Sequence, residues 1–257
     1  MNSLQACSLA SAGFALITLG TVGAAEAATL IDTTPSWDKF YGIGPFGESV
    51  GLTPLHTFGQ TFTVGVDNVL TNFTFFVGNS SDAKNIDMAG YVMSWDGNKA
   101  TGSILYQSAP RPVFPTTSPT SRYYGEFTFG TGDLALSSGN QYVAFISVAN
   151  LVKLPYDDAF VGQLNGNPYP GGDLVFLQGK SLDELRNIDV TQLTTSVPWQ
   201  THITRGGIRD DAAFKASFVS ANKTVPESTS IWGLLGFGCL GAVAKLKKGK
   251  GFVGRCK

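Results

Sequence analysis

Apolar and polar residues alternate along several short stretches of the chain, and a period of two predicts half-buried β-strands. The clearest alternation is found at 58–64, 122–129, 141–148 and 212–219. Weaker patterns predict further strands at 70–77, 88–95, 103–107 and 173–177. Leu70 is out of phase with Phe73 and Phe75, so we expect a bulge near Thr71.

Turn and cap signals separate these strands. Asp96-Gly97-Asn98 and the segment 137–140 have the composition of tight turns. The proline- and glycine-rich segments 110–121 and 150–172 are expected to be loops, and 29–54 an irregular lead-in with one strand. Ser181 and Glu184 have the spacing of a capping box, which predicts one short helix ending at Asn187.

About eight short strands with little helix favour an all-β domain. We expect an antiparallel β-sandwich, jelly-roll-like, that occupies residues 28–222. No internal repeat is present in the sequence.

The hydrophobic pattern changes near the C-terminus, where residues 231–244 contain no charged side chain. As a helix this run would measure roughly 21 Å, against about 30 Å for the hydrocarbon core of a bilayer. With Ser228–Ser230 and a snorkelling Lys245 it reaches the lower limit for a transmembrane helix. The alternative is a buried C-terminal helix of a soluble domain.

A basic tail follows this run and predicts its orientation. Cations gather on the cytoplasmic side of membrane proteins, so we expect the tail to remain in the cytoplasm. The cations that carry this prediction are Lys245, Lys247, Lys248 and Lys250, together with Arg255 and Lys257.

The first 27 residues have the pattern of a secretory signal peptide, with an apolar stretch that ends at an A-x-A cleavage site. Ala25 and Ala27 are the small residues of that site, and Ala28 would become the new N-terminus. An uncleaved N-terminal anchor is the alternative. The three cysteines, Cys7, Cys239 and Cys256, all lie outside 28–222, so that domain can form no disulfide.

Val225-Pro226-Glu227-Ser228, the apolar run and the lysine-rich end together resemble the PEP-CTERM sorting signal of bacterial exosortase systems. Ser228 stands where the family usually has proline. The resemblance covers residues 223–257 and also extends to the expected sandwich domain. It implies export, anchoring in the inner membrane by the helix at 231–244, and processing near Pro226 by an exosortase-like enzyme. The protein would then reach the cell surface or the extracellular polysaccharide matrix.

The charge balance of the domain bears on its partners. Residues 28–223 contain 12 Lys and Arg against 17 Asp and Glu, a net charge of 12 − 17 = −5. No basic stripe is available for phosphate groups, so we expect no nucleic-acid partner.

Catalytic and metal-binding signals are weak. His56 and His202 lie far apart in sequence and belong to no zinc motif, and no G-x-S-x-G element occurs. Carboxylates gather in loops, at Asp96, Asp157, Asp158, Asp210 and Asp211. We expect solvated surface or turn caps there; a structural Ca²⁺ site and a pair of catalytic carboxylates are the alternatives.

Aromatic side chains give the better functional hypothesis. Trp37 and Trp199 lie in polar, loop-like segments, so we expect them to be exposed and able to contact sugar rings, whereas Trp95 is expected in the core. Tyr123 and Tyr124 could add further ring faces. The sequence therefore predicts a non-catalytic surface or matrix protein that binds polysaccharide. An extracellular carbohydrate-active hydrolase and a structural spacer without ligand are the alternatives.

Overall fold

The computed structural model describes residues 29–47, 55–79, 86–113, 124–151, 158–204 and 207–221. The expected signal peptide (1–27), sorting motif, transmembrane run (231–244) and basic tail lie outside these ranges. Within them, no helix is long and apolar enough to cross a membrane.

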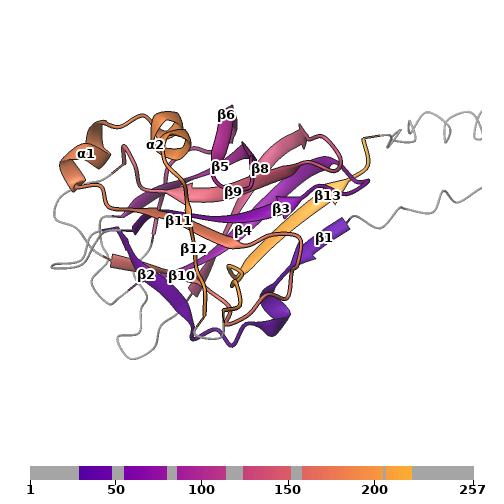
Figure 1. Ribbon diagram of the computed structural model, residues 1–257, viewed down its shortest axis with the longest axis horizontal. Coiled ribbons are helices and arrows are strands. Elements are labelled where there is room, and N and C mark those ends of the chain that lie inside the picture. The colour runs from indigo at the N-terminus through magenta and orange to yellow at the C-terminus, as the bar shows by residue number, and fades with distance from the viewer. Residues whose placement is uncertain are drawn as a thin grey trace, which may run out of the picture.

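The described chain is mostly antiparallel β-structure (Figure 1). Its first elements are β1 (Thr29–Asp32), the 3-10 helix η1 (Thr34–Ser36), β2 (Gly42–Gly47), β3 (Leu55–Thr63), β4 (Val69–Asn79), β5 (Asp87–Trp95), β6 (Ala100–Gln107) and β7 (Arg111–Pro112). These are followed by β8 (Tyr124–Ala135), β9 (Gln141–Ser147), β10 (Asp158–Gly162), β11 (Leu174–Gln178), α1 (Leu182–Asn187), α2 (Val190–Ser196), β12 (Gln200–Thr201) and β13 (Phe214–Val219).

Strand pairing arranges these elements in two layers. One layer has the order β1-β13-β4-β8, and the other has the order β12-β11-β3-β9-β5-β6. β10 pairs with β4 and β2, and a single parallel bridge joins β2 to β3, so these two strands connect the layers along one edge. Apolar side chains of both layers meet in the main core, among them Phe58, Phe62, Phe73, Phe75, Ile146 and Phe214.

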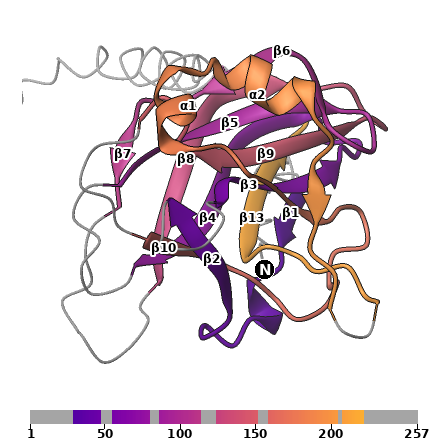
Figure 2. The same cartoon turned by 60° about the vertical axis from the view of Figure 1, so that its left-hand side comes forward.

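Alternation along the strands gives each layer a second, outward face. In β9, Ala144 and Ile146 belong to the main core, whereas Val143 and Phe145 point to the other side. Helices α1 and α2 cover this outer side (Figure 2). Leu185 and other apolar residues of the helices pack there. The outer face of the β13-β4-β8 layer is covered differently, by the segment around η1.

Most of the expected strands are confirmed. The bulge is confirmed as well: the register between β4 and β8 shifts between Leu70 and Asn72. Ser181 caps α1, because its hydroxyl accepts a hydrogen bond from the Glu184 backbone N–H while the Glu184 carboxylate accepts one from the Ser181 N–H.

Three expectations need correction. The segment 150–172 is not all loop, because it contains β10. This short strand pairs with β4 on one side and with β2 on the other. The lead-in holds two strands, β1 and β2, rather than one. A second helix, α2, follows α1 and is capped by Asp189, whose carboxylate accepts a hydrogen bond from Gln192 N–H at 2.9 Å.

Candidate functional site

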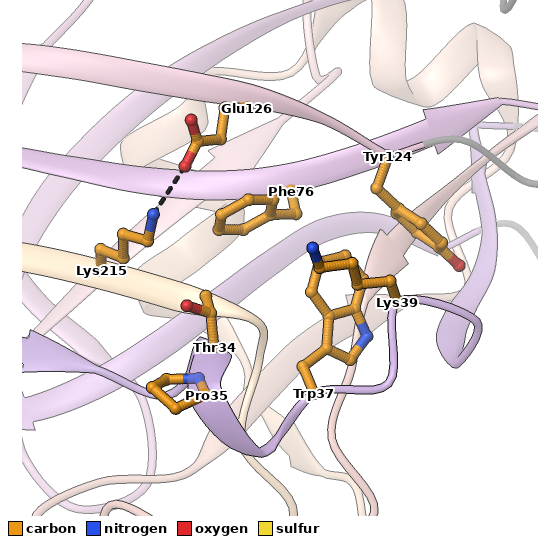
Figure 3. A pocket seen from close by; sticks show the side chains of 8 residues that line it. All are labelled: Thr34, Pro35, Trp37, Lys39, Phe76, Tyr124, Glu126 and Lys215. Carbon is orange, nitrogen blue, oxygen red and sulfur yellow. Dashed lines mark hydrogen bonds and ion pairs between the residues drawn. The ribbon is translucent and has the colours of Figure 1, made fainter.

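A pocket of about 670 Å³ lies on the outer face of the β13-β4-β8 layer; we refer to it as the aromatic pocket (Figure 3). Its volume is within the range of small-molecule sites, about 300–1,000 Å³. The pocket is lined by Thr34, Pro35, Trp37, Lys39, Phe76, Tyr124, Glu126 and Lys215.

The strands supply the wall of the pocket because their side chains alternate between the two faces of the layer. In β4, Phe75 enters the main core and the next residue, Phe76, points outward. Glu126 of β8 is the direct cross-strand partner of Phe76. Lys215 of β13 lies between the core residues Phe214 and Ala216 and therefore faces outward as well.

Lys215 and Glu126 form an ion pair across β4. The lysine Nζ is 2.6 Å from Glu126 Oε1 and 5.1 Å from the centroid of the Phe76 ring. The pair is partly exposed, so its contribution to stability is small, about 0–1 kcal/mol. Its main consequence is local: the two charges compensate each other above an aromatic ring.

The segment after β1 supplies the opposite wall, and Thr33 anchors it. Thr33 is buried, and its Oγ1 donates a hydrogen bond to Ala212 O at 2.7 Å and accepts one from Phe214 N–H at 2.8 Å. Asp32 holds the next residue by accepting from Thr34 N–H at 2.9 Å. The entrance to η1 is therefore fixed to the start of β13.

Trp37 is the central ring of the pocket. Its ring centroid is 5.2 Å from that of Phe76 and 4.9 Å from that of Tyr124, with the second pair edge to face. Its Nε1–H donates to Tyr41 O at 2.9 Å, so the indole orientation is fixed. Trp37 therefore contacts both other rings, and together the three rings form an apolar lining.

The expectation that Trp37 and Trp199 are exposed is wrong. Trp37 is 7% and Trp199 is 6% exposed. Trp199 packs against Phe145 and Trp95 on the helix-covered face and donates from Nε1 to Thr194 O. The structure therefore places the two tryptophans in different clusters, and only Trp37 lines the aromatic pocket.

The loop carboxylates differ from one another. Asp96 caps its turn as expected, accepting from the N–H groups of Asn98 and Lys99 at 2.8 Å, and these hydrogen bonds lower its pKa. Asp157 lies outside the described residues. The expectation of a solvated surface is wrong for Asp210 and Asp211, which are fully buried.

Asp210 and Asp211 hold a buried polar network together. Asp210 Oδ2 is 2.7 Å from His202 Nδ1 and accepts from Gln163 Nε2 at 2.6 Å. Asp211 accepts from Gln60 Nε2 at 2.7 Å and from Tyr169 N–H at 2.8 Å. Burial raises the pKa of Asp211 to about 7, and the nearby Asp173 and Asp210 add to this.

This network has a structural explanation, since each carboxylate is bonded to backbone or side-chain groups of neighbouring segments. It joins β3, the segment before β11 and the segment before β13. Across the described ranges, no group of three or more His, Cys, Asp or Glu side chains is arranged to hold a metal ion.

The sequence indicated Trp37 and Tyr124 but missed Lys39, Phe76, Glu126 and Lys215. A signal for the last three exists in the strand patterns, because each occupies the outward phase of its strand. The sequence does not show that β13, β4 and β8 pair with one another, and this pairing brings the three positions side by side.

Comparisons with protein-family models, with curated proteins and with solved structures found no match to this chain.

Proposed function

We propose that this protein is an exported cell-surface or matrix protein whose β-domain binds saccharide in the aromatic pocket without catalysing a reaction. The observation that carries the proposal is the lining of the pocket. Trp37, Phe76 and Tyr124 supply apolar ring surface, and a lysine–glutamate pair lies beside them.

Sugar rings fit this combination chemically. Their C–H faces favour contact with aromatic surface, while their hydroxyls need hydrogen-bond donors and acceptors at the rim. Thr34, Glu126 and Lys215 can supply these, and hydrogen bonds to the two charged groups are stronger than neutral ones.

The composition of the pocket also supports a binding role over hydrolysis. Most glycoside hydrolases need two carboxyl groups on opposite sides of the scissile bond. Among the described residues that line the pocket, Glu126 is the one carboxylate, and it is paired with Lys215.

The route to the surface rests on the terminal patterns. By its resemblance to PEP-CTERM proteins, we propose that the chain is cleaved after Ala27, anchored by the helix at 231–244 and processed near Pro226 by an exosortase-like enzyme. We further propose that the two layers of the domain form a jelly-roll-like sandwich. Terminal sequencing of protein recovered from the native surface tests the processing steps.

The test of the binding function is a polysaccharide panel with the purified full chain, in which retention and release of reducing ends are measured together. Retention without release is the expected result. Release of reducing ends would replace the binding function with a hydrolase, and the absence of both would leave the chain as a structural spacer.

A further inference from the structure

Lys39 adds a second positive charge to the lining of the aromatic pocket. Lys215 and Glu126 neutralise each other at 2.6 Å, whereas Lys39 lines the pocket and forms no ion pair with any residue in the described ranges. The surrounding domain has an excess of acidic residues, with a net charge of −5 over residues 28–223 (12 − 17). Among the residues that the structure describes, Lys39 is thus the pocket cation without an ion-pair partner, and its charge is opposite in sign to the net charge of the domain.

The backbone at Lys39 is in a conformation that lysine seldom adopts. Its φ is +65°, in the left-handed region, where glycine or asparagine would cost less. The lysine therefore occupies this position against its local backbone preference, which points to a role for its side chain.

Neighbouring hydrogen bonds hold this turn in place. Asp38 Oδ1 accepts from the N–H groups of Phe40 at 2.8 Å and Tyr41 at 3.0 Å. Tyr41 O accepts from Trp37 Nε1 and from Gln163 N–H. The lysine is thus presented from a pre-organised turn, which reduces the entropy lost when a ligand binds.

Two aromatic side chains follow Lys39 on the same turn and are largely exposed, Phe40 by 70% and Tyr41 by 60%. Large apolar side chains that remain exposed on a rigid turn add contact surface beyond the pocket itself. A ligand longer than one sugar ring could use them.

We infer that the aromatic pocket selects an acidic oligosaccharide, with a sugar carboxylate beside Lys39 and further rings extending over the Phe40–Tyr41 turn. The inference rests on the proposed saccharide-binding function and specifies its ligand class. A carboxylate beside the ammonium group gains a charge-assisted hydrogen bond, and the adjacent aromatic lining reduces competition from water. An uncharged sugar at the same position gains neither.

The test compares two probes that differ only at the carboxyl groups: oligogalacturonate and the same oligomer with these groups methyl-esterified, which removes the negative charge and adds a methyl group. Binding to the full chain is measured by titration calorimetry at low salt. We expect the acid to bind at least about tenfold more tightly than the ester. We expect added salt to reduce this preference, because the charges are near the surface.

Three variants locate the effect. Lys39→Gln should reduce affinity for the acid at least about tenfold more than affinity for the ester and so abolish the preference, and Lys39→Arg should restore it. Lys99→Gln, which removes a lysine from the β5–β6 turn, should change neither affinity. Lys39 is exposed, so these substitutions leave the packed rings in place.

The outcomes separate the inference from the proposed function. Equal affinity for the two probes, or a preference that survives in Lys39→Gln, overturns the acidic selectivity and leaves saccharide binding in place. Failure to bind either probe, together with failure to retain any polysaccharide of the panel, overturns both.

Discussion

The absence of a side chain at Gly162 allows the Trp37 ring to pack in its observed position in the aromatic pocket. A β-carbon at this position would lie 2.8 Å from the Trp37 ring and 2.9 Å from the Ala213 side chain. Both contacts are shorter than packed carbon atoms tolerate, so the ring or the strand must move. A shift of the Trp37 ring would also disturb Tyr124, which packs edge to face against the same indole.

We therefore expect Gly162→Ala to lower the free energy of unfolding by about 1–3 kcal/mol and to change the tryptophan signal in near-ultraviolet circular dichroism. Gly65→Ala is the matched control, since a β-carbon there meets no atom within 4 Å. Denaturant titration measures both. An unchanged free energy of unfolding for Gly162→Ala would contradict the close packing of Trp37 against Gly162.

At the scale of single residues, the sequence indicated that Trp37 has a functional role but did not predict how buried its side chain is. Trp37 and Trp199 were expected to be exposed because their neighbours in sequence are polar, yet both are buried. Burial of Trp37 depends on Gly162 and Ala213, which lie far along the chain. A local pattern cannot reveal contacts at such separations.

At the scale of elements, α1 begins at a reciprocal cap. Ser181→Ala removes one half of it, and the expected loss is about 1 kcal/mol of unfolding free energy, measured by thermal or denaturant unfolding. Helices α1 and α2 cover the opposite layer from the aromatic pocket. Saccharide affinity should therefore stay unchanged, and a parallel loss of affinity would contradict the separation of the two faces.

Two buried titratable groups in or beside β3 have opposite effects on stability. Burial lowers the pKa of His56 from 6.5 to about 4, assisted by the charge of Lys180. Burial raises the pKa of Asp211 from 3.8 to about 7. Between pH 4 and 6.5 the unfolded chain binds a proton at residue 56 that the folded chain lacks, and the folded chain binds one at residue 211 that the unfolded chain lacks.

The contribution of His56 to stability thus rises with pH in this window, while that of Asp211 falls, each by on the order of 1.4 kcal/mol per pH unit. In the native chain the two contributions oppose each other. We expect Asp211→Asn to expose a stability that rises from pH 4 to 6.5, and His56→Gln to expose one that falls. Denaturant unfolding at several pH values measures the slopes, and equal slopes in both variants would contradict the assignment.

The helices and strands were largely predictable where the local sequence contains a period-two pattern or a capping motif. The bulge at Thr71 and the box at Ser181 are examples. β10 was missed because its five residues are followed by a segment rich in loop-forming residues, and only pairing with β4 and β2 makes it a strand. The network around Asp211 could not be predicted either, because Gln60 is 151 residues away in sequence.

At the scale of the whole molecule, β1 and β13 fix the placement of the pocket relative to the chain ends. Thr29 pairs with Phe218 and Asp32 with Lys215, so the first and last described strands bring both ends of the described domain to one side (Figure 1). Lys215 and the η1 segment lie at the other end of this strand pair. If the chain is anchored through its C-terminal segment, the aromatic pocket lies at the end away from the attachment.

The all-β class was predictable at this scale because alternation is repeated in many segments. The two layers were expected as well. The order in which the strands pair, and the pocket on the outer face of one layer, were not, since a local pattern does not show which strands pair.

The central claim is that saccharide binds in the aromatic pocket, and the two tryptophans test it most directly. The measurement is retention of the full chain in affinity electrophoresis through polysaccharide-containing gels, for the native protein, Trp37→Ala and Trp199→Phe, with circular dichroism to verify folding. We predict that Trp37→Ala loses retention while Trp199→Phe, altered on the helix-covered face, keeps it. Retention that survives in a folded Trp37→Ala variant would contradict the account.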